Sequence, residues 1–444
     1  MRYLPHTKEE IQEMLAVTGH EKLESLFDHI PEHCRYQGTI DTPEPLSEWA
    51  LTDHFQSLAA NIETTSAKAV LLGAGNYSHH IPAIVPSLIG RSEFLTAYTP
   101  YQPEMAQGTL QGIFEYQTLT ARLLGMEVAN ASMYDGASAL AEALLMTLRI
   151  ARKKNTVAIS SAIHPHYREV VSTYLQASPF TIVELPVGAD GRTDLSSLQD
   201  IDDLAAVALQ SPNFFGVIED LATAGQDIHS VDALFVTCFS EPFAYGLLRS
   251  PGASGADIVC GEGQSFGMAP SFGGPGLGMF ACRKKFLRSM PGRLVGETVD
   301  LDGKRGWVLT LSTREQHIRR EKATSNICSN QGICALTAAA YMASLGNTGL
   351  RRIAKLNYDK AAYLKDELIQ AGAQLVFSGS TFNEFALTFS KDFKVIRKRL
   401  LDKGIIAGID LGRFYEQYQG AYLFCVTETV SKKVLDEFIN EVRS

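Results

Sequence analysis

The central part of the chain alternates short apolar runs with helix-like segments, and this alternation limits the possible folds more than any other feature. The apolar runs predict strands at Ala69–Leu72, Val157–Ser160, Thr181–Leu185, Ala205–Gln210, Leu234–Thr237, Asp257–Cys260 and Leu277–Cys282. A long helix is predicted to begin at Asp135, which suits an N-cap. Strands that are apolar along their whole length are typical of a parallel or mixed sheet with helices on both faces. The sequence therefore predicts an α/β protein.

The two ends of the chain follow other patterns and predict two further domains. At the N-terminus, Thr7-Lys8-Glu9-Glu10 matches a capping box, and apolar residues follow at helical spacing. Residues 1–60 are therefore predicted to form a helical arm that wraps the main body or a partner. Beyond residue 330 the pattern mixes helices, at 333–345, 357–371, 393–401 and 432–442, with strands at 385–389 and 422–426. We predict a large domain over residues 61–330 and a small α+β domain over residues 331–444.

Composition and charge argue against several classes of function. The net charge of −9 disfavours a nucleic-acid partner, because such proteins present a basic face. No apolar run reaches the roughly 20 residues of a membrane span, so no membrane association is predicted. The seven cysteines are odd in number and form no C-x-x-C motif, which disfavours a disulfide framework or a metal site. The sequence thus predicts a reduced, cytoplasmic protein without a bound metal.

Residues 255–286 carry the most informative motif, which reads GADIVCGEGQSFGMAPSFGGPGLGMFACRKKF. Two strand-like runs flank polar residues and a glycine cluster around Pro275, as expected where the backbone turns tightly or approaches a ligand. Considered alone, this stretch predicts a hairpin between two core strands. The order of its residues resembles the cofactor-lysine region of pyridoxal-phosphate (PLP) enzymes with the aminotransferase-like fold, fold type I. Within that fold it resembles the P-protein of the glycine cleavage system.

Two further stretches carry the same resemblance. Residues 96–104 read TAYTPYQPE, and residues 313–328 read TREQHIRREKATSNIC. By itself the second stretch predicts only a solvated, ion-paired helix face, yet it is the most specific single match to the P-protein pattern. The resemblance covers essentially the whole chain. It implies a fold type I large domain with a mixed, mostly parallel sheet, and a small C-terminal α+β domain.

The expected cofactor position lacks the atom that its chemistry needs. In P-proteins a His-Lys pair follows the strand, and the lysine forms a Schiff base with PLP. The corresponding pair here is Gln264-Ser265, and neither an amide nor a hydroxyl forms an imine. No lysine stands between Lys154 and Lys284. With His164, which the resemblance places against the cofactor ring, Gln264 and Ser265 are predicted to form a vestigial slot, with no catalytic residue in this chain alone.

Other cofactor positions are equally ambiguous. Asn130–Ala139 leads from a strand into a helix whose N-terminus would hold the phosphate in a PLP fold, but Asp135 favours simple N-capping there. No Asp stands at the end of the strand Leu234–Thr237 to pair with a pyridinium nitrogen, and Glu241 is a poor match. The glycines of Leu72–Tyr77 predict a turn, because the spacing of a dinucleotide fingerprint is absent.

The stretch Tyr98–Glu104 is predicted to be a stiff loop, because two prolines resist helix formation. Its residue types suit either a surface loop with packed tyrosines or the wall of a pocket. The resemblance favours the second interpretation. Tyr98, Tyr101 and Glu104 are therefore the candidate substrate-binding residues, in a site shared with a neighbouring subunit.

The resemblance implies a function that depends on a second chain. P-proteins occur as one long chain or as two related subunits, and a chain of this length without the lysine is similar to the α subunit of the split form. Its implied partners are a homologous PLP-bearing β subunit, glycine and the lipoylated H-protein, and the implied reaction is glycine decarboxylation with aminomethyl transfer. Two alternatives stay open: a self-sufficient PLP enzyme that uses a lysine elsewhere, and a non-catalytic scaffold or regulatory protein on a PLP-enzyme fold.

Overall fold

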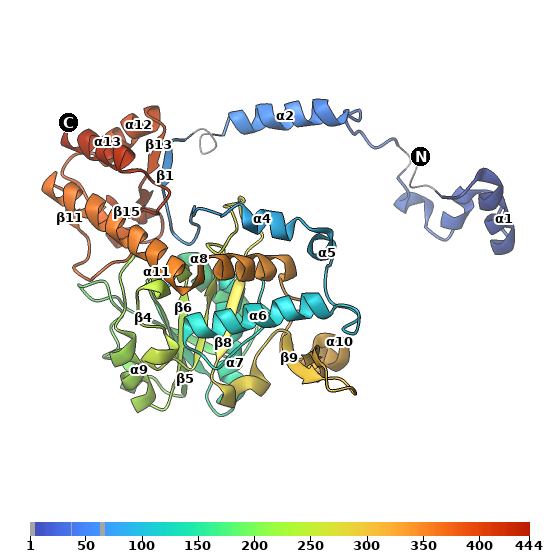
Figure 1. Cartoon of the computed structure of the whole chain (residues 1–444), viewed down its shortest axis with the longest axis horizontal. Helices are drawn as coiled ribbons and strands as arrows, with labels where there is room; N and C mark the ends of the chain where they lie inside the picture. The colour runs from blue at the N-terminus through green and yellow to red at the C-terminus, as the bar shows by residue number, and fades with distance from the viewer. Residues whose placement is uncertain (1–4, 37, 63–66) are drawn as a thin grey trace. The chain divides into compact units, whose positions relative to one another are not determined.

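The computed structural model describes residues 5–36, 38–62 and 67–444 of the 444-residue chain (Figure 1). It divides into two units, Met1–Ile62 and Glu63–Ser444, which are described separately. Because Glu63–Ser444 is one compact unit, the domain boundary near residue 330 stays a prediction.

The first unit is helical, as the sequence predicts. It contains α1 (Lys8–Thr18), two 3-10 turns (Leu23–Phe27 and Glu32–Cys34) and α2 (Glu48–Ala60). The capping box at Thr7 is confirmed: its side chain accepts from the Glu10 N–H, and the Glu10 carboxylate accepts from the Thr7 N–H. Of the described residues in this unit only Leu15 is buried, and Trp49 is 75% exposed. The unit therefore has very little core of its own.

The second unit is built on a seven-stranded sheet. In spatial order its strands are β2 (Val128–Ala129), β8 (Gly278–Cys282), β7 (Ile258–Glu262), β6 (Leu234–Phe239), β5 (Leu204–Gln210), β3 (Thr156–Ser160) and β4 (Thr181–Leu185). Strand β8 runs antiparallel to β2 and β7, and the other pairs are parallel. The mixed, mostly parallel sheet is thus confirmed. Strand β7 pairs on both sides, so the motif at 255–286 begins inside the sheet.

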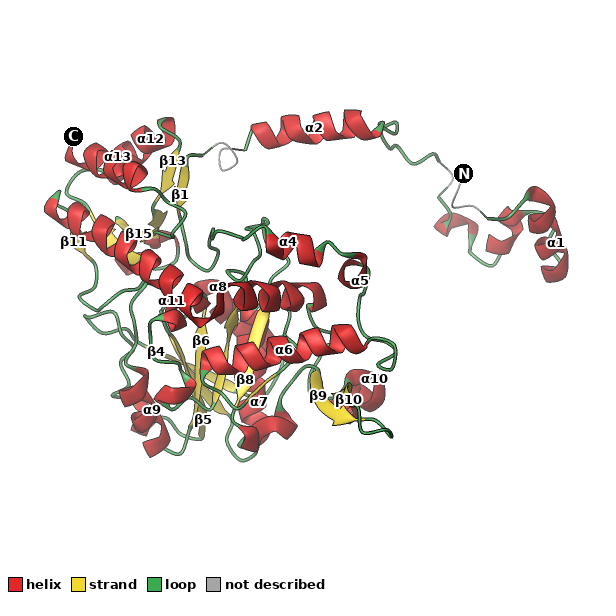
Figure 2. Ribbon diagram, viewed as in Figure 1, coloured by secondary structure: helices red, strands yellow, loops and turns green. Residues whose placement is uncertain are grey.

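Helices cover both faces of this sheet (Figure 2). One face packs against α6 (Gln107–Leu124), α9 (Leu221–Ser230) and the first half of α11 (Gly332–Gln370), and the other against α7 (Gly136–Ile150) and α8 (Pro165–Leu175). Side chains alternate between the faces, because successive residues of a strand point to opposite sides. The two-sided burial explains why the strands are apolar along their whole length.

A second, smaller sheet follows in the C-terminal part. Its antiparallel order is β11 (Gln374–Leu375), β12 (Glu384–Thr388), β15 (Ala421–Cys425) and β14 (Ile409–Asp410). Helices α12 (Phe393–Asp402) and α13 (Lys432–Arg443) share its core, where rings such as Phe385, Phe424 and Phe438 are fully buried. The strands predicted at 385–389 and 422–426 and the helices predicted at 393–401 and 432–442 are confirmed to within a residue or two.

Three expectations need correction. Strand β1 (Ala69–Leu71) pairs in parallel with β13 (Ile405–Ala407), and not with the central sheet. Three apolar residues carry no signal for a partner, and burial of Leu71 in the C-terminal core decides the pairing. The helix predicted from residue 357 begins about ten residues earlier, because the second segment of α11 starts directly after the interruption at Gly346. Residues 313–328 form only short turns around α10 (Gln316–Arg319), not one helix.

The remaining elements border the loop at 98–104. Helices α4 (Ile84–Ile89) and α5 (Ser92–Leu95) precede it. The antiparallel hairpin of β9 (Leu294–Val299) and β10 (Arg305–Thr310), which the sequence analysis missed, follows the central sheet. The Gln107 side chain links this hairpin to α6 by bonding both the N–H and the carbonyl of Trp307, each at 2.9 Å.

Gly346 interrupts α11 in a conformation that other residues rarely adopt, and its replacement should cost stability. Its φ of 59° and ψ of −177° lie in a region that is essentially restricted to glycine. A Cβ there would meet no atom within 4 Å, so the cost is purely in the backbone. We expect Gly346→Ala to lower the free energy of unfolding by about 1–3 kcal/mol, measured by urea denaturation.

Gly108→Ala is the matched control. Gly108 lies in α6 and also has open space around a Cβ, but its backbone is helical. Alanine should therefore raise the free energy of unfolding there by roughly 0.5–1 kcal/mol. Equal effects of the two substitutions would contradict the strained conformation at Gly346.

Candidate functional site

Three of the sequence-predicted site residues lie at the carboxyl ends of parallel strands, the edge where α/β sheets bind ligands. His164 follows β3 and caps α8, and Gln264 and Ser265 follow β7. All three are buried. Residues 74–80, between β1 and α4, lie against them and hold them in the contacts described next.

Gln264 holds the backbone of Tyr77 with both ends of its amide. Its Oε1 accepts from the Tyr77 N–H at 3.1 Å, and its Nε2 donates to the Tyr77 carbonyl at 3.0 Å and to the carbonyl of Met268. The side chain at the first slot position is thus fully engaged in fixing another segment of the chain.

Ser265 stands where the resemblance places the cofactor lysine. It is 2% exposed, and its Oγ has no hydrogen-bond partner among the described residues. Leaving a buried hydroxyl unpaired costs roughly 1–3 kcal/mol, so this serine does not contribute to stability through hydrogen bonds. Lys285 does not substitute for a slot lysine, because its side chain is 66% exposed and its Nζ pairs with Asp257 at 3.5 Å.

His164 is neutral and covered by the chain itself. Burial lowers its pKa to about 4. Its Nδ1 accepts from the His166 N–H at 3.2 Å, so the proton is assigned to Nε2, which donates to the Ala74 carbonyl at 2.9 Å. The ring stacks on Tyr167, with centroids 5.0 Å apart and planes at 30°.

A hydroxyl network attaches the same segment to both sheets. The Tyr77 hydroxyl donates to the Glu384 carboxylate on β12 at 2.8 Å and lies 3.0 Å from the Ser240 hydroxyl after β6. The second oxygen of Glu384 accepts from the Ala74 N–H at 2.6 Å. Burial raises the pKa of Glu384 to about 7. Gly73 permits this approach, because a Cβ there would lie 2.0 Å from the carboxylate.

A buried ion triad completes the attachment. His79 Nε2 lies 2.8 Å from Glu241 Oε2, and Nδ1 lies 2.8 Å from Glu428 Oε2. Since both ring nitrogens face carboxylates, both donate, and the imidazole is charged. Burial lowers the pKa of His79, but the two carboxylates outweigh it and raise the pKa to about 9. Glu241, considered above as a pyridinium partner, is therefore committed to His79.

Sequence reasoning missed Tyr77, His79, Glu384 and Glu428 as members of this cluster. The partners of His79 lie 162 and 349 positions away along the chain. Nothing local to the segment indicates such contacts, because the glycines at 73–75 predict only a turn. The one available signal was the pair of histidines, 79 and 80, next to that turn.

The predicted substrate-binding loop lies at a different cavity, of about 640 Å³. Tyr101 lines it together with Arg293, Glu315 and seven other residues, Thr99, Pro100, Pro103, Leu309, Ser312, Gln316 and Cys328. The Arg293 guanidinium donates to the Thr99 hydroxyl and lies 3.5 Å from the Glu315 carboxylate.

The rings of the loop are open to the surroundings. Tyr98 and Tyr101 stack with centroids 6.3 Å apart and are 71% and 78% exposed. Glu104 is exposed as well, and neither Tyr98 nor Glu104 lines the cavity. The structure therefore divides the sequence-predicted residues into a closed slot and an open loop.

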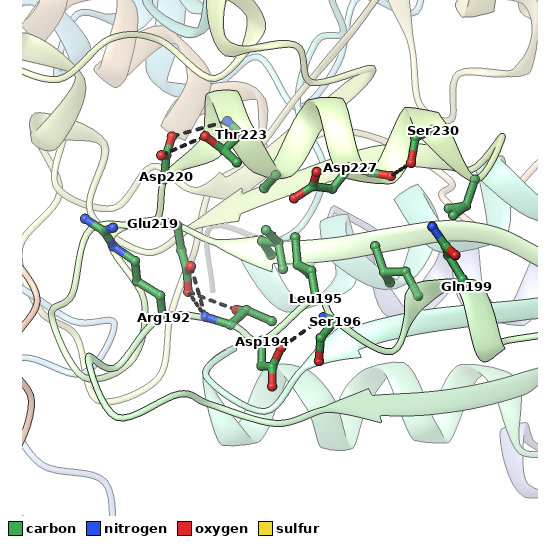
Figure 3. Close-up of a pocket in the computed structure, with 15 residues that line it drawn as sticks. Arg192, Asp194, Leu195, Ser196, Gln199, Glu219, Asp220, Thr223, Asp227 and Ser230 are labelled. Carbon is green, nitrogen blue, oxygen red and sulfur yellow. Dashed lines mark hydrogen bonds between the residues drawn. The ribbon is translucent and has the colours of Figure 1, made fainter.

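Another cavity, of about 520 Å³, holds none of these residues (Figure 3). Several of its polar groups have partners: Glu219 accepts from the Thr193 N–H and hydroxyl, and Asp220 caps α9 by accepting from the Thr223 N–H. Asp194 likewise accepts from the Ser196 N–H at 2.9 Å. These bonds stabilise the loop and the helix start that border the cavity.

Comparisons with known proteins agree with this architecture. Residues 1–442 match the family described as "Glycine cleavage system P-protein". The chain belongs to the P-protein family. It is 65% identical over 443 residues to a "Probable glycine dehydrogenase (decarboxylating) subunit 1" of Desulfotalea psychrophila, with 100% of this chain and 98% of the relative covered. A protein of the same description from Oceanobacillus iheyensis is 48% identical, with 99% and 98% covered.

Solved structures place this P-protein family member in its fold class. The crystal structure of a glycine decarboxylase (P-protein) of the glycine cleavage system, in inhibitor-bound form, is 43% identical, with a TM-score of 0.91 and 100% and 99% of the two chains covered. A sphingosine-1-phosphate lyase of Burkholderia pseudomallei, at 14% identity and a TM-score of 0.68, covers 93% of this chain and 94% of its own and shares the fold. The predicted fold type I is confirmed. Within the described ranges, no helix of this P-protein chain combines the length and apolarity needed to cross a membrane.

The His79 triad should make the stability of this P-protein chain depend on pH. The folded chain binds the His79 proton more tightly than the unfolded one, so this contribution is complete below pH 6.5 and is lost as pH rises through about 9. At 1.36 kcal/mol per pKa unit, it amounts to about 3 kcal/mol. We expect urea denaturation to show a free energy of unfolding that falls over this range.

His79→Gln should remove most of that slope. His229→Gln is the matched control, because His229 pairs with a single carboxylate, that of Asp257, and its side chain is 45% exposed. It should leave the slope in place. Parallel pH profiles for wild type and His79→Gln would show that the triad does not hold the proton.

Proposed function

We propose that this chain is the α subunit of a two-subunit P-protein. Together with a homologous PLP-bearing β subunit it decarboxylates glycine and passes the aminomethyl group to the lipoyl arm of the H-protein. The observation that carries the proposal is the full-length match to proteins described as subunit 1 of a decarboxylating glycine dehydrogenase. The closed slot supports it, because a chain without a Schiff-base amine depends on another chain for that chemistry.

The residues of this chain indicate which tasks it can perform and which it leaves to the partner subunit. PLP supplies the electron sink for decarboxylation, and this chain offers no amine for it at Gln264-Ser265. What this chain provides is the loop 98–104 beside the 640 Å³ cavity. Binding and orientation of a small substrate are tasks that such a loop performs without covalent chemistry.

The loop is suited to reach into a neighbour's site. Pro100 and Pro103 limit its conformations, which reduces the entropy lost when it orders against a ligand. Tyr98 and Tyr101 expose their hydroxyls, and Glu104 exposes a carboxylate. Tyrosine hydroxyls can donate to the glycine carboxylate, and Glu104 can orient such a donor. Arg293, bonded to Thr99, anchors the base of the loop.

We also place the complex in the cytoplasm. All seven cysteines are free, and five of them are buried. Buried free thiols of this kind suit a reducing compartment.

The test is substitution within the loop of the assembled complex. We expect Tyr101→Phe or Glu104→Gln to lower the rate of glycine–bicarbonate exchange about ten-fold, since losing one positioned interaction costs roughly 1.4 kcal/mol. Tyr358→Phe, at another exposed tyrosine on α11, should leave the rate unchanged. Assembly and the PLP content of the partner should be the same in all variants.

Full activity of both loop variants would leave this chain as a scaffold for the β subunit. Loss of assembly, by contrast, would show that the loop builds the interface and does not position substrate.

A further inference from the structure

The three expected cofactor positions are joined by a closed circuit of contacts within this chain. Gln264 clamps Tyr77, and the neighbouring Ala74 carbonyl accepts from His164. His164 stacks on Tyr167. On the other side, the Gln264 N–H donates to Glu262 Oε1 at 3.0 Å. Tyr167 and Glu262 both lie next to Gly136 at the N-terminus of α7, so these contacts link all three positions in a ring.

Glu262 takes the place expected of a phosphate. Its Oε2 accepts from the Gly136 N–H, the first of α7, at 2.9 Å. Its Oε1 accepts from the N–H groups of Gln264 and Leu277, at 3.0 and 2.8 Å. A helix N-terminus and glycine-rich backbone N–H groups are the usual cradle for a phosphate. Here the buried Glu262 carboxylate occupies that position. Asp135 places a second carboxylate at the same end of α7, where it accepts from the Ser138 N–H.

Tyr167 takes the place expected of the cofactor ring. Its own ring is buried and stacks on that of His164 with the planes at 30°, at the position where the cofactor ring would stack. Its hydroxyl points to the start of α7: a Cβ on Gly136 would lie 2.3 Å from that oxygen and 2.8 Å from the Glu262 nitrogen. An aromatic ring on His164 and an anion on α7 thus reproduce the two halves of the cofactor with protein groups.

Residues 73–80 close the remaining side. Gly75 has a φ of +89°, and a Cβ there would lie 3.2 Å from the His164 ring. The segment is held by Glu384 at Ala74, by Gln264 at Tyr77 and by Glu428 at His80, whose N–H donates to Glu428 Oε1 at 2.7 Å. A ligand entering the slot would have to displace all of these bonds.

We propose that this chain has filled the cofactor cavity of its fold with its own residues: Tyr167 for the ring, Glu262 for the phosphate and residues 73–80 as a fixed cover. PLP does not fit there, with or without a lysine, and the cavity serves as a structural joint between the two sheets. The inference does not depend on the loop at 98–104, so the failure of one proposal leaves the other standing.

The first test restores the missing amine. The full chain carrying Ser265→Lys, or Gln264→His with Ser265→Lys, is incubated with PLP, reduced with borohydride and mapped by mass spectrometry. We expect neither variant to be labelled at position 265, although both fold, as judged by circular dichroism and assembly with the partner. Stoichiometric labelling at that position would overturn the proposal.

The second test opens the cavity. Equilibrium dialysis with PLP compares the wild-type chain with Tyr167→Ala, which removes the ring from its place on His164. We expect Tyr167→Ala to bind PLP about ten-fold or more tightly than wild type, a difference of roughly 1.4 kcal/mol. Tyr174→Ala, on the same helix, is the matched control and should bind as weakly as wild type. Equal binding by all three proteins would contradict the assignment of Tyr167.

A third measurement needs no substitution. In hydrogen exchange on the assembled complex, the amides of Ala74, Tyr77 and Gly136 should be protected at least 100-fold, which is about 2.7 kcal/mol, since each donates to a buried side chain. Exchange at the rate of an open loop would show that the cover is mobile, and would overturn its role as a fixed part of the fold.

Discussion

The buried charge of His79 is the interaction on which the arrangement of the second unit most depends. It lies between Glu241, just after β6, and Glu428, just after β15, and therefore ties the edge of the central sheet to the smaller sheet through residues 74–80. Removing one member of a buried charged group costs about 3–5 kcal/mol, because the remaining charge is left without a partner. The connection between the two sheets therefore depends on the presence of all three side chains, His79, Glu241 and Glu428.

The same segment explains what became of the cofactor slot. A cavity left by a missing ligand is costly, because protein interiors are close-packed and unfilled space loses contacts. In this chain the space next to His164 is filled by Tyr167, and the cradle at the start of α7 holds Glu262. The Ser265 hydroxyl is left buried without a hydrogen bond among the described residues. If the proposed filling of the slot is correct, loss of the cofactor position and gain of a structural connection are two aspects of one packing change.

The features that suit a partner lie away from this joint. The stacked rings of Tyr98 and Tyr101 are exposed beside a cavity that contains Arg293 and Glu315. The first unit buries little of its own apolar surface, as the exposure of Trp49 shows. Exposed apolar surface commonly marks an interaction site. A chain that is closed at its own slot and open at its loop is consistent with a subunit that contributes to a site centred on another chain.

The sequence by itself determined the features that depend on neighbouring residues. The apolar runs indicated the strands, Thr7 and Asp135 indicated the helix caps, and no lysine stands between Lys154 and Lys284 to match the family's Schiff-base position. These signals are local, since a strand or a cap is specified within a few positions of the chain. The resemblance to P-proteins was equally accessible, because it rests on the order of residues in short motifs.

The tertiary structure alone decided which distant groups meet. It paired β1 with β13, placed His79 between carboxylates 162 and 349 positions away, and turned the Gln264 amide onto Tyr77. It also placed the loop at 98–104 beside a cavity whose lining includes none of His164, Gln264 and Ser265. The physical reason is that hydrogen bonds and buried charges gain their energy from desolvated partners, and folding alone brings those partners together.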